Sequence, residues 1–242
     1  MRRTRYWLRQ IHIWLGLILG LQVFAWLLSG LVMSLIPIEQ VRGSAWVHQP
    51  DEAIGGHLQE FRVTPGAISG GLPADASVVA ALRAGEPIYL VQQGRSTLRA
   101  ISALDGHEMP ALDGAQAAAI ARAAHSDHPA VVQSVEVATP EGEARGLSGP
   151  VWRVSLADRW SSNVYVDPVS GRVLSVRNDL WRFYDFFWML HIMDYGDRED
   201  INTPLLRVMA GWSTFLGLSG LWLLVYSFGG RYTHPPQERR SP

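Results

Sequence analysis

The sequence predicts a membrane protein of α+β class, in which two transmembrane helices bracket a domain of helices and antiparallel strands. Two apolar runs carry this prediction, residues 11–36 near the start of the 242-residue chain and residues 208–228 near its end. Each meets the length of about 20 apolar residues that a helix needs to cross roughly 30 Å of hydrocarbon. The stretch between them alternates polar and apolar residues and is rich in turn-forming residues, which is typical of a small antiparallel sheet.

Residues 1–36 are predicted to form an N-terminal arm and the first transmembrane helix. The run has arginines before it, and more arginines follow the second run: Arg2, Arg3, Arg5, Arg9, Arg231, Arg239 and Arg240. Flanking positive charge stays on the cytoplasmic side, so both termini are expected there, and the enclosed domain is periplasmic in a bacterial inner membrane. A cleaved signal peptide is the alternative, since Gly43, Ser44 and Ala45 offer a cleavage site. The run is longer than the 7–15 residues of a signal core, which favours an anchor.

Residues 37–177 form the enclosed domain, which reads as two degenerate repeats over residues 72–110 and 114–177. Each repeat is expected to contain a helix followed by an antiparallel meander. The second repeat is predicted to hold a helix over 115–124 and strands over 131–137, 151–156, 163–166 and 172–176. For the first repeat we expect a helix over 74–83, strands over 87–92 and 97–103, and an edge strand at 60–63 before it.

A tight hairpin turn is the clearest local signal of the domain. Asp167, Pro168 and Gly171 occupy the positions at which these residue types favour a turn. We expect Gly171 to have a positive φ there, since glycine adopts that conformation without a steric penalty.

Residues 178–204 are predicted to lie at the outer membrane surface. The segment 180–193 is too short to span a membrane, and its dense aromatic residues are typical of an interfacial helix. A charged turn follows, and Asn202, Thr203 and Pro204 have the composition of a helix cap and first turn. The second transmembrane helix is then expected over 205–228 and a cytoplasmic tail over 229–242.

Small residues on both predicted spans indicate close helix packing. Gly16 and Gly20 form a GxxxG pair, and Ser213 and Gly217 form a second small-xxx-small pair. Such spacing lets helix backbones approach closely in lipid. The two spans are therefore expected to contact membrane lipid and to pack on each other, on another membrane subunit or on a second copy of the chain. Gln22 could add an interhelical hydrogen bond.

The composition excludes several classes of site. The chain has no cysteine, which excludes disulfides, iron–sulfur clusters and cysteine nucleophiles. All its basic residues are arginine, so no lysine can form a Schiff base, and the net charge of −1 predicts no nucleic-acid partner. Hydrolase and P-loop motifs are missing. We therefore predict no catalytic residue. A non-catalytic subunit is favoured over a stand-alone enzyme.

Three sequence features together resemble one known family. They are Arg9, His12, Trp14, Gly16 and Leu17 opening the first span, the strand and turn over 164–174, and Leu190 with His191 before the last span. The chain resembles a PepSY-associated transmembrane protein, which implies a PepSY-like fold for residues 37–177. Larger members of that family have four spans and resemble ferric-siderophore reductases, in which histidines at span ends hold b-type haem.

This chain has only two predicted spans and no recognisable flavin or nicotinamide domain. The resemblance therefore implies an accessory protein or subunit of a membrane electron-transfer or iron-reduction system. His12 and His191 are the candidate haem ligands. Other PepSY domains resemble inhibitory or chaperoning modules of peptidases, which leaves a second function open. It is a non-catalytic, membrane-anchored module that binds a periplasmic peptide or protein or assists assembly.

Each histidine also has a plainer interpretation. His12 could be an interfacial residue, and His191 could anchor the domain within the aromatic belt. They are expected at opposite ends of a span and hence some 30 Å apart, so each would need a partner histidine from another subunit. His125 and His128 lie near Asp127, but too few ligands converge for a metal site, and we interpret them as a solvated loop. We interpret His48, His57 and His107 in the same way.

Overall fold

A computed structural model describes residues 2–44, 47, 54–70, 72–94, 96–125 and 131–229. In the terminal helices, it leaves the side chains of residues 2–6, 8, 9, 11, 12, 15, 223, 224 and 226–229 outside the description. The chain divides into two compact units. The first joins Met1–Ser34 to Phe186–Pro242, and the second is Leu35–Asp185.

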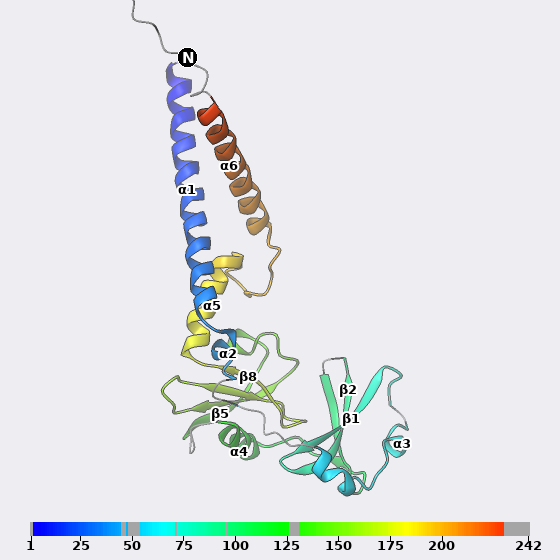
Figure 1. Ribbon diagram of the computed structural model, residues 1–242. Coiled ribbons are helices and arrows are strands. Elements are labelled where there is room, and N and C mark those ends of the chain that lie inside the picture. Colours follow the sequence, from blue (N-terminus) through cyan, green and yellow to red (C-terminus); the bar gives the residue numbers. More distant parts are fainter. Residues whose placement is uncertain are drawn as a thin grey trace, which may run out of the picture. The chain divides into compact units, whose positions relative to one another are not determined.

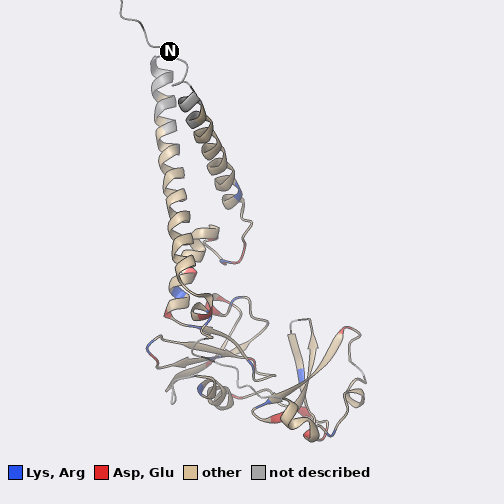
Figure 2. Ribbon diagram, in the orientation of Figure 1, with Lys and Arg blue, Asp and Glu red and all other residues tan. Residues whose placement is uncertain are grey.

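The first unit is helical. It contains α1 (Arg2–Leu35), the C-terminal part of α5 (Asp179–Ile192) and α6 (Pro204–Gly229) (Figure 1). Gly16–Leu35 is the one helical stretch among the described residues that is long and apolar enough to cross a membrane. Figure 2 shows that this stretch of α1 carries no charged residue, whereas charged residues are frequent in the second unit.

One face of α1 is covered and the opposite face is open. Leu19 and Ser29 are buried, and Gln22 and Trp26, at helical spacing between them, are partly buried. The open face consists of large apolar side chains, among them Trp14, Leu17, Leu21, Phe24, Leu28 and Leu31. A continuous exposed apolar surface of this kind requires lipid or a partner to cover it.

The start of α6 has the cap that its sequence predicts. Thr203 accepts a hydrogen bond on Oγ1 from the Leu206 amide at 3.1 Å, and Pro204 occupies the first helical position. The predicted second span, residues 208–228, lies within α6. That it crosses a membrane stays a prediction.

The second unit contains two four-stranded antiparallel sheets, each ordered as a simple meander, β1-β2-β3-β4 and β5-β6-β7-β8. The first sheet consists of β1 (Ala76–Arg83), β2 (Glu86–Gln93), β3 (Ser96–Ser102) and β4 (Glu108–Met109). The second consists of β5 (Val132–Ala138), β6 (Val151–Leu156), β7 (Asn163–Val166) and β8 (Val173–Arg177). Short helical turns precede or interrupt the strands: α2 (Ile38–Val41), η1 (Ile54–Glu60), α3 (Pro65–Ile68) and η2 (Gly142–Ala144).

The second repeat forms the predicted helix and meander. Its helix, α4 (Gly114–Ala124), begins with a capping box in which Asp113 and Gln116 satisfy each other's backbone amides. The alanine face of α4 packs on the inner side of the second sheet, where Val154, Val164 and Val166 are fully buried. Local helix propensity, capping and strand alternation all indicate the same fold in this repeat, which explains why the prediction is correct.

The first repeat differs from the prediction. Residues 74–83 were expected to form a helix, but Ala76–Arg83 is strand β1, paired along its whole length with β2. A two-residue turn joins the strands, with Ala84 at φ +54° and Gly85 at φ +85°. Such a turn matches strand twist and favours the hairpin, and this tertiary pairing overrides the helix propensity of four alanines. The expected edge strand at 60–63 is also wrong, because η1 occupies Ile54–Glu60 and coil follows it.

The coil after η1 still covers the first sheet. Phe61, Ile68 and Leu72 pack on the face that contains Tyr89 and Val91. Tyr89 donates its hydroxyl hydrogen to the Val63 carbonyl at 2.8 Å. One face of the first sheet is therefore closed by residues 61–72.

A buried arginine at the end of β1 joins the two sheets. Arg83 is 7% exposed and donates through Nη1 to the carbonyls of Pro110 and Val169, both at 3.0 Å. Val169 belongs to the predicted hairpin turn, in which the Asp167 carboxylate accepts the amides of Val169 and Ser170. Burial lowers the pKa of Arg83. Arg83 thus fixes the turn of the second sheet against the first.

Candidate functional site

His191 lies on the last turn of α5 and contacts α1. Its Nδ1 is 3.0 Å from the Ser29 Oγ atom, and its backbone carbonyl accepts a hydrogen bond from Trp26 Nε1 at 2.9 Å. Ser29 has no exposed surface. Two side chains one turn apart on α1 therefore fix both the ring and the backbone of His191.

Ser29 lies between the His191 ring and the backbone of α1. Its Oγ atom donates to the Trp26 carbonyl at 3.1 Å and lies 3.0 Å from His191 Nδ1. In the tautomer that carries its proton on Nδ1, the ring donates to Ser29 and Nε2 keeps its lone pair. Nε2 makes no hydrogen bond with any described residue. That tautomer is the one in which histidine binds metals through Nε2.

The imidazole ring lies beside Gly30. A Cβ atom placed at Gly30 would be 3.7 Å from His191 Cε1, an ordinary van der Waals distance, so the ring lies close to the backbone of α1. Sequence reasoning did not identify Ser29, Gly30 or Trp26. A Ser-Gly pair within an apolar span was the available signal, because small polar residues in a span mark close contacts.

His12, the other predicted haem ligand, belongs to the backbone of α1, but its side chain lies outside the described residues. Seventeen residues of helix separate it from Ser29, the residue that contacts His191. At about 1.5 Å per residue, the two levels are roughly 25 Å apart. This spacing is close to the predicted one, and it keeps His12 and His191 from sharing one haem within a chain.

The three predicted packing glycines have no close neighbour among the described residues. A Cβ atom at Gly16, Gly20 or Gly217 would have no described atom within 4 Å. Ser213 Oγ and Gln22 Nε2 are buried atoms for which no hydrogen-bond partner occurs among the described residues. Packing of these small residues against a partner helix stays a prediction.

His125 is buried, contrary to the prediction of a solvated loop. Its side chain is 2% exposed, and Nε2 lies 3.1 Å from Oδ2 of Asp158, which is 9% exposed. The other oxygen of Asp158 accepts the amides of Trp160 and Ser162. Burial acts to raise the pKa of Asp158, but the hydrogen bonds from Ser162, His125 and Trp160 outweigh it and hold the pKa below its usual range.

The remaining histidines lie on the surface or outside the described residues. His57 and His107 are exposed beside Glu60 and Asp105. His48 and His128 lie outside the described residues. Within the part of the chain that the structure describes, no three histidine, aspartate or glutamate side chains converge as a metal site.

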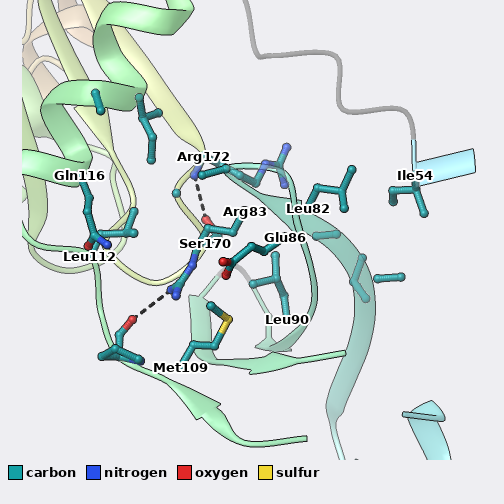
Figure 3. Close-up of a pocket in the computed structure, with 18 of the residues that line it drawn as sticks. Ile54, Leu82, Arg83, Glu86, Leu90, Met109, Leu112, Gln116, Ser170 and Arg172 are labelled. Carbon is teal, nitrogen blue, oxygen red and sulfur yellow. Dashed lines mark hydrogen bonds between the residues drawn. The ribbon is translucent and has the colours of Figure 1, made fainter. Parts of the chain in front are cut away.

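A groove in the second unit is the other candidate site (Figure 3). Its volume is about 920 Å³, and it lies between the first sheet and helix α4. Leu90, Met109 and Leu112 give it an apolar lining, while Arg83, Glu86 and Arg172 contribute charge. Volumes of this size are typical of ligand sites.

The groove was not predicted, because it depends on β1 being a strand. Val79 to Ala84 line it without a gap, and Gln116, Ala119, Ile120 and Ala123 face them from α4. Residues so far apart in the sequence meet only once the two sheets are joined at Arg83.

Comparison with known proteins gives one match. A family model described as PepSY-associated TM region matches residues 9–241, essentially the whole chain. No curated protein and no solved structure matches it.

Proposed function

The chain belongs to the PepSY-associated TM family, and from this premise we propose that it is a membrane subunit of an electron-transfer or iron-reduction system. Family membership and the candidate span Gly16–Leu35 identify a membrane protein. In this proposal His191 would hold b-type haem together with a residue of another subunit. His12 is the corresponding candidate at the opposite end of α1.

The geometry of His191 is the observation that carries the proposal. Ser29 fixes the imidazole through Nδ1 and leaves Nε2 available, and the ring lies beside Gly30 of α1. Haem iron takes an imidazole nitrogen as its axial ligand, and a hydrogen bond on the other nitrogen orients the ring and raises its basicity. A haem bound there would supply one-electron transfer near the end of the span.

The test is a reduced-minus-oxidised absorption spectrum of membranes that contain the protein and its partners. A dithionite-reducible b-type spectrum is expected, and His191→Ala should remove most of its amplitude at an unchanged amount of protein. Ser29→Ala should retain haem with a lower affinity, because it loses the hydrogen bond to Nδ1 but keeps the ligand. His107→Ala, at an exposed histidine, serves as the control and should leave the spectrum unchanged.

An absence of haem in the intact complex would contradict the proposal. So would a full spectrum when both His12→Ala and His191→Ala are present. The interpretation of His191 as a residue that only anchors α5 would then be the better one.

The proposed topology places both termini in the cytoplasm and the second unit in the periplasm. It rests on the arginines that flank the two apolar runs. A reporter enzyme that is active only in the periplasm should be active when fused after Gly94 and inactive when fused after Arg240. A cytoplasmic signal from the Gly94 fusion would contradict this orientation.

A second candidate function is a membrane-anchored module that binds a peptide or protein. The observation that favours it is the groove of about 920 Å³, whose lining is mostly apolar and includes Arg83, Glu86 and Arg172. This function does not require haem. The two candidates therefore differ in their spectra and in the unit that carries the site.

A further inference from the structure

No described strand pairs with the outer edge of β1, although η1 contacts part of the strand. β1 is the terminal strand of its sheet and pairs only with β2, in a regular register that begins with Arg83 opposite Glu86 at the turn. In a two-residue hairpin the two residues that flank the turn form a hydrogen-bonded pair. Along the strands, hydrogen-bonded pairs then alternate with pairs that are not hydrogen-bonded to each other. The backbone groups of Val78, Ala80 and Leu82 therefore point away from β2. None of them forms a backbone hydrogen bond with a described residue beyond the hairpin.

The groove runs along this open edge. Val79, Ala81 and Arg83 share one face of the sheet, which forms the floor of the groove with Leu90 and Met109. Ala80 and Leu82 alternate to the opposite face, where Ala80 packs beside residues 61–72. Both nevertheless line the groove. They reach it along the edge of the strand, where their unpaired N–H and C=O groups lie.

The opposite wall is one face of α4. Gln116, Ala119, Ile120 and Ala123 follow helical spacing and line the groove together. Two of the four are alanines, which leave room for side chains of an occupant. The groove thus combines a strand edge with a helix face, the arrangement in which extended peptides add to a sheet and place alternate side chains against a helix.

The exposed guanidinium of Arg172 favours an acidic group in the occupant. Arg83 also lines the groove, but it is buried, donates to the Pro110 and Val169 carbonyls and interacts with the Glu86 carboxylate. Arg172 is exposed and forms no ion pair with a described residue, since the arginine ion pairs there involve Arg99, Arg145, Arg153 and Arg182. A carboxylate beside Arg172 would pair with this guanidinium.

We propose that the groove binds an extended acidic segment of a partner protein, which pairs with the free edge of β1. Backbone hydrogen bonds form at Ala80 and Leu82, small apolar side chains lie between the sheet and α4, and an acidic group lies beside Arg172. The proposal specifies the site and ligand class of the second candidate function and rests on that function, not on haem binding.

The test measures binding of a fluorescein-labelled peptide to the full chain in detergent by fluorescence anisotropy. The peptide alternates valine with threonine and ends in aspartates. Saturable binding is expected. Ala80→Pro should weaken it at least about tenfold, because proline removes the outward N–H while leaving the ladder to β2 intact. Ala80→Ser keeps the N–H and should bind within about twofold of the wild type.

Two further arms keep the test decisive if Ala80→Pro fails to fold. A peptide N-methylated at every second residue loses its donors on one edge and should not bind the wild-type chain. Arg172→Glu should weaken the acidic peptide and leave a peptide ending in asparagine unchanged.

Equal binding of the N-methylated peptide would overturn the proposal, and so would no binding of any peptide. A dimer of the chain that Ala80→Pro abolishes would instead identify a second copy as the occupant. The haem spectrum of the same preparations is a separate measurement, so a failure of the haem proposal is distinguishable from a failure of this one.

Discussion

Replacing Gly171 with valine is expected to destabilise the second unit strongly and to lower its melting temperature. Gly171 has φ +72°, a conformation that β-branched residues adopt poorly. A Cβ atom there would also lie 3.1 Å from Arg83 Cγ and 3.3 Å from Ile120 Cδ1 and Leu112 Cδ1. Backbone strain and overpacking together should cost about 2–4 kcal/mol. Thermal unfolding of the full chain in detergent, followed by circular dichroism, measures this effect.

Gly94→Val is the matched control for this substitution. Gly94 also has a positive φ, +59°, but no atom of the described residues lies within 4 Å of a Cβ placed there. It therefore reports the backbone strain alone, and its melting temperature should fall less. Equal shifts for the two variants would mean that the contact of the turn with Arg83 and α4 contributes nothing measurable to stability.

Asp158→Ala is expected to have the second large effect on stability. The substitution removes the acceptor of three donors, the His125 ring and the amides of Trp160 and Ser162. Because His125 is buried and loses this partner, the cost should be about 3 kcal/mol. Chemical unfolding of the variant and the wild type measures the difference in the free energy of unfolding.

Two variants test whether the carboxylate itself is responsible. Asp158→Asn keeps an acceptor oxygen and should cost less, and Asp75→Ala, at an exposed hydrogen-bonded carboxylate, should be close to neutral. The pKa of Asp158 is depressed in the folded chain, so its contribution is complete above the usual aspartate pKa of about 3.9. It is lost as the pH falls through the folded pKa. Asp158→Asn should therefore show a shallower loss of stability in acid.

The elements that sequence reasoning predicted correctly are those with local signals. The alanine-rich composition of residues 115–124, the turn at Gly171 and the cap at Thr203 each lie within or next to the element that they define. Helix α4, the strands of the second sheet and the starts of α5 and α6 could be located for this reason. Their packing partners could not be read from the same signals.

The error at β1 arose from two local signals that conflict. Its alanines favour a helix, whereas the Ala84–Gly85 turn favours a hairpin, and pairing with β2 makes the segment a strand. The other errors occur where distant residues decide the structure. The loop interpretation of His125 failed because its partner, Asp158, follows 33 residues later. Ser29 and His191 are 162 positions apart, so the hydrogen bond that fixes the ring of the candidate ligand had no local sequence signal.

The unit that contains His191 is built from the two ends of the chain, and this has a consequence for the order of folding. During synthesis α1 is complete long before α5. Ser29 and Trp26 can therefore contact His191 only after the whole of Leu35–Asp185 has been made. An unstructured loop of that length closes at a considerable entropic cost. Leu35–Asp185 is a continuous segment with its own cores, and its prior folding would replace that flexible loop with a compact one. Destabilising the sheets should therefore delay completion of the helical unit, even though the substituted residues do not contact it.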